Sequence, residues 1–285
     1  MFLGSYYFKQ KAREALKGNW QTALLVTFFS GALVTLEEVL TSLNLPNPYL
    51  LAYGQTDRYV VQLLSISRLN WALMTAVSVL ALLLTPALQV GCNQYFLRRL
   101  QSEQPTLLEG LFSRMRILLK ALWLYILMGV RIFLWSLLFF VPGILAALRY
   151  SMAPYYLADN PELTAGQAIE KSKESMKNMK GSYFLLIISF VGWTLLANVL
   201  QMLLMDINGV AALVAAQCAQ LLISTYMTAS CAAFYRTVST PEGMDAAMGD
   251  MRSRLRQMGV DDSQMDFGPK NDDSSPDDDA GDDSQ

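Results

Sequence analysis

RIFLWSLLFFVPGILAALRY, residues 131–150, is strongly apolar, but it carries Arg131 at its start, Arg149 near its end and Pro142-Gly143 between them. Proline removes a backbone hydrogen-bond donor and disfavours helix at the residue before it, and glycine adds flexibility. The stretch therefore predicts a turn at Pro142-Gly143. Whether the chain crosses a membrane once here or enters and returns depends on the charges that flank it.

The composition is typical of a polytopic membrane protein, with 53% hydrophobic and only 16% charged residues. Five apolar runs are mostly long enough for the ~20 helical residues that cross a bilayer. These runs cover residues 20–36, 71–92, 121–148, 182–204 and 209–235.

Lysine and arginine mark the cytoplasmic side of a membrane protein. Basic residues precede the first run and follow the second, and five more lie between the third and fourth runs: Arg149, Lys171, Lys173, Lys177 and Lys180. A single crossing by the third run would place that last group outside. The pattern favours two passes, over 117–140 and 144–157, although the second is so short that it could be a re-entrant segment.

These runs predict an all-α transmembrane bundle of about six membrane segments, with both termini in the cytoplasm. Residues 1–18 form an amphipathic interfacial helix, 19–236 the bundle and 237–260 a Met-rich amphipathic helix. Residues 261–285 hold ten Asp and one Lys, which leaves the body basic, and this tail should be disordered.

A further amphipathic cytoplasmic helix is predicted between the third and fourth runs. Thr164 and Gln167 have capping-box spacing, and Gly181 suits a C-terminal cap. One face of this helix carries a stripe of apolar and small residues: Ala165, Ile169, Ser172, Met176 and Met179.

The sequence argues against an enzyme because it contains no histidine. Its three cysteines have no paired spacing, so we expect no metal site, and no cofactor motif or nucleic-acid-binding surface is present. The acidic residues near the spans, Glu37, Glu38 and Asp206, lie at the ends of apolar runs and are interpreted as boundary residues.

Several blocks of the sequence resemble a known family. They include LLTPALQVGCNQYFLRR, LEGLFSRM, FFVPGILAALRYSMAPYYLADNPELTAGQAIEKSKESMKNMKGSYFLLIISFVGWTLLA and YMTASCAAFYR, within residues 9–236. This chain resembles a bacterial family of integral membrane proteins known as domain of unknown function 975. The resemblance implies a six-segment bundle in the bacterial plasma membrane and no established activity.

Two intramembrane sites are candidates for function. Arg131 and Arg149 need partners at bilayer depth, and lie ~17 Å and ~10 Å from the predicted turn along their helices. They could share a basic pocket for an anionic headgroup or solute, or else snorkel or bond to helix carbonyls. A second polar group comprises Asn198, Gln201, Gln217 and Gln220. These side chains could form interhelical hydrogen bonds or line a transport path.

A third candidate is the methionine stripe after the bundle, formed by Met244, Met248, Met251, Leu255 and Met258. This face could dock a partner protein, lie on the membrane or pack beneath the bundle. Together these features favour a non-enzymatic plasma-membrane scaffold or a module that interacts with membrane lipids or with a protein partner at its cytoplasmic helices. The alternative is a small-solute or lipid transporter with a basic intramembrane site.

Overall fold

The computed structural model describes residues 4–46, 54–204 and 209–257, and every regular element within them is a helix. The predicted all-α class is therefore confirmed over the described part of the chain. The helices are α1 (Ser5–Leu16), α2 (Trp20–Asn44), α4 (Thr56–Leu64), α5 (Arg68–Leu100), α6 (Leu107–Phe112), η1 (Met115–Ile117), α7 (Leu118–Leu138), α8 (Phe140–Tyr150), α9 (Ala153–Asp159), α10 (Ala165–Ser175), α11 (Lys180–Leu204), α12 (Gly209–Ser239) and α13 (Pro241–Gln257).

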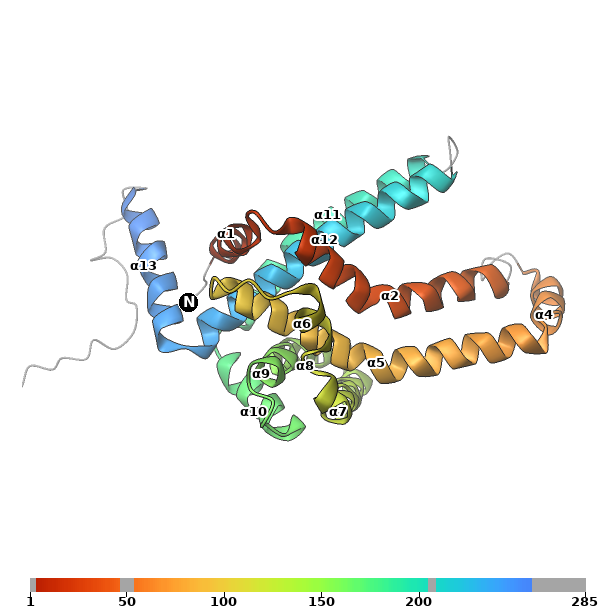
Figure 1. The fold of residues 1–285 in the computed structure, drawn as a ribbon, viewed down its shortest axis with the longest axis horizontal. Coiled ribbons are helices and arrows are strands. Elements are labelled where there is room, and N and C mark those ends of the chain that lie inside the picture. The colour runs from red at the N-terminus through yellow and green to blue at the C-terminus, as the bar shows by residue number, and fades with distance from the viewer. Residues whose placement is uncertain (1–3, 47–53, 205–208, 258–285) are drawn as a thin grey trace, which may run out of the picture.

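Two long helix pairs extend from a common base to the same side of the molecule (Figure 1). One pair is α2 with α5, which α4 joins at the distal end, and the other is α11 with α12. The base consists of α1, α6, α9 and α10 and the parts of α5 and α12 that pack against them. At the distal end of the first pair, the Asn70 side-chain amide donates to Asn44 Oδ1 at 2.6 Å.

Four segments of the described chain are long and apolar enough to cross a membrane. They are Trp20–Thr41, Arg68–Leu100, Leu107–Leu138 and Lys180–Leu203. The structure thus supports four of the predicted crossings by length and composition. The fifth predicted run forms the long helix α12, Gly209–Ser239.

The third apolar run forms two packed helices, α7 and α8, but the break between them is not where Pro-Gly predicted it. The chain is extended at Phe139, with φ −160° and ψ 153°, and α8 begins at the next residue. Pro142 is tolerated in the first turn of α8, where a missing N–H costs nothing. A Cβ on Gly143 would lie 3.0 Å from Ser136 Cα, so this glycine allows α8 to approach α7 closely.

Both flanks of the α7–α8 pair return to the base. Lys120 Nζ at the start of α7 donates to the Pro161 carbonyl at 3.1 Å, and the Arg114 guanidinium before α7 donates to the Ala158 carbonyl in α9. The pair therefore leaves the base and comes back to it. In Figure 1 α7 is seen nearly end-on, so it runs in a different direction from the α2–α5 pair.

The predicted helix after the third run is confirmed as α10. Thr164 and Gln167 form the capping box at its start, and the predicted stripe, from Ala165 to Met179, is buried in the core. Gly181 was expected to end this helix, which is wrong. α10 ends at Ser175, and Gly181 lies inside α11 because that helix already begins at Lys180.

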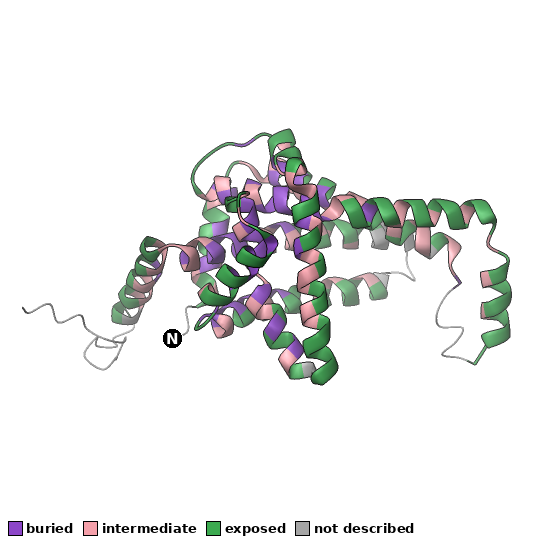
Figure 2. Cartoon of the chain, turned by 90° about the horizontal axis from the view of Figure 1, so that it is seen from below, coloured by how far each residue is buried: buried purple, intermediate pink, exposed green. Residues whose placement is uncertain are grey.

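Buried side chains concentrate in the base, whereas the distal parts of the long helices are exposed (Figure 2). Aromatic rings from distant parts of the sequence form the centre of this core. Phe8 of α1 packs on Phe234 of α12 with ring centroids 4.9 Å apart, and Tyr155 of α9 stacks on Tyr235 at 5.8 Å. The base is thus a packed unit from which the apolar helices extend.

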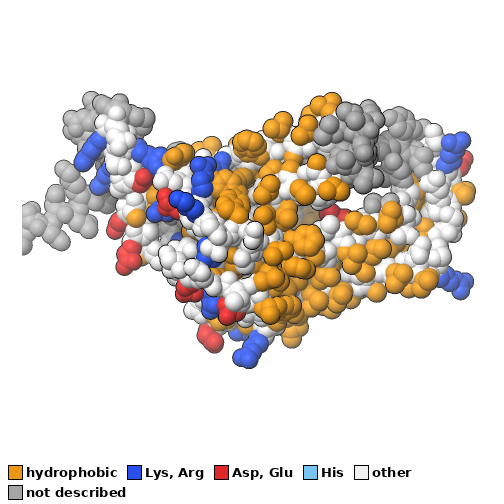
Figure 3. Space-filling model, turned by 45° about the horizontal axis from the view of Figure 1, so that its top comes forward, with side chains coloured by type: hydrophobic (Ala, Val, Ile, Leu, Met, Phe, Trp, Pro, Cys, Tyr) orange, Lys and Arg blue, Asp and Glu red, His pale blue; other side chains and the backbone are white. Residues whose placement is uncertain are grey.

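The exposed surface of the extended helices is apolar. Figure 3 shows a band of hydrophobic side chains between two ends where charged side chains gather. Large side chains in this band are strongly exposed, including Leu82 at 65%, Leu137 at 74% and Trp193 at 60%. Such an apolar surface is far larger than soluble monomers carry and matches the hydrocarbon region of a bilayer.

Candidate functional site: a cationic and aromatic groove at the base

The two arginines of the third run are half-buried and lie on neighbouring helices, Arg131 on α7 and Arg149 on α8. Measured from the break at Phe139, they lie ~12 Å and ~15 Å away along their helices. Their depths therefore differ less than the predicted turn at Pro142-Gly143 implied. Neither lines the pockets described below, and Arg149 lies close enough to Lys180 for their like charges to interact. A basic pocket shared by the two arginines therefore stays a prediction.

The four polar residues of the fourth and fifth runs do not form one cluster. Gln217 and Gln220 line a pocket of about 370 Å³ together with Thr27 and Thr35 of α2. Asn198 is exposed on α11, and neither it nor Gln201 lines this pocket. Gln217 and Gln220 therefore share this pocket with α2.

The methionine face of α13 is partly used inside the molecule. Met244 and Met251 pack against the core, and Met248 is half-buried. α13 is also tied to α1, because the Arg254 guanidinium donates to Gln10 Oε1 at 2.9 Å and lies over the Tyr6 ring. Met258 and the side chain of Leu255 lie outside the described part of the chain.

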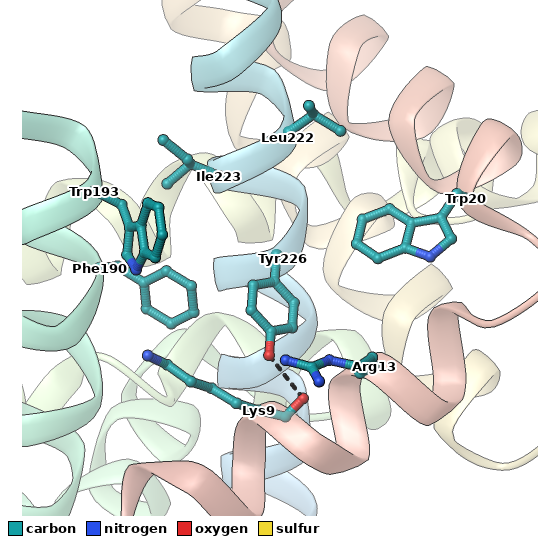
Figure 4. A pocket seen from close by; sticks show the side chains of 8 residues that line it. All are labelled: Lys9, Arg13, Trp20, Phe190, Trp193, Leu222, Ile223 and Tyr226. Carbon is teal, nitrogen blue, oxygen red and sulfur yellow. Dashed lines mark hydrogen bonds between the residues drawn. The ribbon is translucent and has the colours of Figure 1, made fainter. Parts of the chain in front are cut away.

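A groove that the sequence did not predict lies where α1 meets α2, α11 and α12 (Figure 4). Its volume is about 400 Å³. Four aromatic side chains line it, from three different helices: Trp20, Phe190, Trp193 and Tyr226. Leu222 and Ile223 of α12 extend the apolar wall, and Lys9 and Arg13 of α1 form one edge.

The fold of α1 places the two basic residues at this edge. Phe8, Ala12 and Leu16 recur at helical spacing and are buried, so the neighbouring positions 9 and 13 face the groove. Gly18 has φ +81°, a conformation that glycine adopts at little cost, and it turns the chain from α1 into α2. Trp20 is consequently the first residue of α2 and stands beside the end of α1.

Contacts within the groove fix its aromatic wall. The Tyr226 hydroxyl donates to the Lys9 carbonyl at 3.0 Å, and its ring lies 5.5 Å from Phe190 and 6.5 Å from Trp20, centroid to centroid. The Lys9 ammonium lies 4.6 Å from the centroid of Phe190, within cation–π range. Lys9 and Tyr226 therefore hold α1 against α12.

The groove is positively charged and has no internal counter-ion. No carboxylate in the described part of the chain lies within ion-pair distance of Lys9 or Arg13, whereas Lys11 on the same helix pairs with Glu14 at 3.6 Å. Burial lowers the pKa of Lys9 below its ordinary value of 10.5. A bound anion would offset that effect, so the groove is suited to an anionic group attached to an apolar body.

Comparison with known proteins identifies part of the chain. Residues 137–242 match the family described as protein of unknown function, DUF975. The family resemblance predicted from the sequence is thereby confirmed over this segment. No curated protein and no solved structure matches the chain.

The DUF975 segment supplies three aromatic residues of the groove, Phe190, Trp193 and Tyr226, whereas Lys9, Arg13 and Trp20 precede it. The sequence did predict an interfacial helix over residues 1–18, which includes Lys9 and Arg13. It could not show that Phe190 and Tyr226 face them, because these residues are far apart along the chain and no local periodicity joins them. The family description names no activity, so the function must be argued from the groove.

Proposed function

We propose that this protein is a non-enzymatic integral protein of the bacterial plasma membrane that binds anionic phospholipid headgroups in the groove. The observation that carries the proposal is the open cationic edge formed by Lys9 and Arg13 beside an apolar, aromatic pocket. Both termini are in the cytoplasm, and the cytoplasmic helices of the base provide contacts for a protein partner. The resemblance to DUF975 supports the bacterial membrane location.

The groove lies at the level where a bilayer changes from hydrocarbon to headgroups. α1 is amphipathic and belongs to the base, whereas α2, which follows it, is one of the candidate spans. Tryptophan and tyrosine are enriched at membrane interfaces, and both occur in this groove as Trp20, Trp193 and Tyr226. An amphipathic helix with basic residues at this level is typical of a segment that lies in the interface.

The chemistry of the groove matches that of a phospholipid. Its cationic edge would contact the phosphate through the half-buried Lys9 and the exposed Arg13. The acyl chains would extend along the apolar wall of Leu222, Ile223 and Trp193. Each basic residue near an anionic surface contributes about 1 kcal/mol, so losing both should weaken binding by roughly 30-fold.

Native mass spectrometry of the detergent-purified full chain tests this proposal. Phosphatidylglycerol and phosphatidylcholine are added at matched concentrations, and the bound fraction of each lipid is measured. The double variant Lys9→Gln/Arg13→Gln should lose most of its preference for phosphatidylglycerol. The control, Lys11→Gln/Lys17→Gln, removes the same charge from exposed positions of α1 that do not line the groove, and it should keep that preference.

Two results would contradict the proposal. The wild-type protein could bind both lipids equally, which would remove any role for the cationic edge. Alternatively, the two double variants could lose the preference to the same extent, which would assign the effect to overall charge and not to the groove.

A second candidate function is passage of a small solute or lipid. It is favoured by the pocket that Gln217 and Gln220 form with α2, since polar side chains there lie between apolar helices. Gln217→Leu should then reduce transport by protein reconstituted in vesicles without lowering expression. Transport that is unaffected by this change would count against the pocket as a path.

A further inference from the structure

A further cavity, of about 680 Å³, lies between α2, α5 and α7. Polar side chains from all three helices line it: Glu37, Ser78, Thr85, Gln89 and Tyr125. Val34, Ala81 and Leu82 supply apolar walls. The cavity belongs to the extended helices and is separate from the groove, with which it shares no lining residue.

Glu37 was interpreted as a boundary residue, and it lies inside the candidate span Trp20–Thr41, ~6 Å from the end of that span along α2. Its Oε1 accepts a hydrogen bond from the Ser78 hydroxyl at 2.6 Å. No Lys or Arg among the described residues lies within ion-pair distance of this carboxyl group. An acidic side chain within a membrane span is costly without a partner and is a candidate functional position.

The remaining polar groups of the cavity also lack partners. The Thr85 hydroxyl is buried without a hydrogen bond, and Gln89 and Tyr125 make none through their side chains with the described part of the chain. Pro86, one residue further along α5, has no N–H, so the Leu82 carbonyl lacks its usual donor four residues on. Leu82 and Pro86 both line the cavity, so several of its oxygen acceptors have no donor among the described residues.

We propose that this cavity binds a small organic cation that carries a protonated amine. The ammonium group would contact the Glu37 carboxylate and the nearby hydroxyl oxygens, and the organic part would pack against Val34 and Leu82. The volume lies in the range of small-molecule sites and far exceeds that of a bare metal ion. This inference goes beyond the proposed lipid binding and does not depend on it.

The test uses the full chain in lipid nanodiscs and cyclohexylammonium as the probe, with cyclohexanol as its neutral counterpart. Calorimetric titration should show saturable binding of the ammonium compound and none of the alcohol. Glu37→Gln keeps the shape of the side chain and removes its charge, so binding should weaken about tenfold or more. Glu38→Gln is the matched control, because Glu38 is exposed and does not line the cavity, and it should bind as the wild type does.

Equal binding of cyclohexanol, equal losses in the two glutamate variants or displacement of the probe by Na⁺ or K⁺ at matched ionic strength would each overturn the proposal. If Glu37→Gln does not fold, Tyr125→Phe decides the matter. That variant removes one acceptor oxygen from the cavity and leaves the ring in place. It should bind the probe several-fold more weakly, and unchanged binding would overturn the assignment.

Discussion

The contact between α5 and α6 can be tested at Gly91. A Cβ at this position would lie 2.8 Å from both the Gly110 and the Leu111 carbonyl oxygens, whereas ordinary contact begins at 3.4 Å. Both oxygens belong to the backbone of α6, which a capping box between Thr106 and Glu109 fixes in place. The two helices would therefore have to separate by several tenths of an ångström in Gly91→Ala.

Overpacking of this kind costs about 1–3 kcal/mol, and two backbone contacts place Gly91→Ala near the upper end. Alanine regains about 1 kcal/mol through its higher helix propensity, so the net loss in unfolding free energy is about 2 kcal/mol. At roughly 2–4 °C per kcal/mol for a chain of this size, the apparent Tm should fall by about 4–8 °C.

The assay is thermal unfolding of the detergent-purified protein, followed by tryptophan fluorescence at one fixed scan rate. Gly129→Ala on α7 is the control, because no atom lies within 4 Å of a Cβ built there. Its Tm should stay the same or rise slightly. A Gly91→Ala protein as stable as the Gly129→Ala protein would refute the close packing of α6 on α5.

Three further predictions follow from individual contacts. Asp159 accepts a hydrogen bond from the Tyr235 hydroxyl at 3.0 Å and forms an ion pair with Arg236 at 3.3 Å. Asp159→Asn should therefore lower the Tm by a few degrees. An unchanged Tm would show that these contacts do not hold α9 against α12. Burial lowers the pKa of Lys9 below 10.5, and only the protonated side chain attracts phosphate. Phosphatidylglycerol binding should therefore weaken as the pH rises through that lowered pKa. The variant Lys9→Arg should remove this pH dependence. Met251→Glu places a charge against the core and should release α13, which limited proteolysis would detect as earlier cleavage after residue 239.

The parts of the fold that the sequence predicted are those that local signals specify. The capping box at Thr164 and the burial of the stripe from Ala165 to Met179 were both confirmed, although α10 itself ends at Ser175. The break in the third run was predicted at the wrong residues because proline and glycine each occur in more than one structural context. Proline also suits the first turn of a helix, and glycine also allows close packing, here against Ser136.

The groove and the cavity could not be predicted, because each combines residues from helices that are distant in the sequence. Lys9 and Phe190 are brought together by the packing of α1 against α11 and α12. Glu37 was placed at the end of an apolar run, whereas both the helix and the candidate span continue past it, to Asn44 and Thr41.

Topology tests the central claim, that the extended helices cross a membrane and leave the base and its groove in the cytoplasm. The measurement is labelling by a membrane-impermeant thiol reagent in intact and opened cells, with Cys92, Cys218 and Cys231 replaced. Ser172 is buried and unsuitable, so Lys171→Cys on the exposed face of α10 reports on the base, and Asp57→Cys in α4 reports on the distal end. Position 57 should be labelled in intact cells, and position 171 only in opened cells. Labelling of both positions from the same side would contradict the central claim.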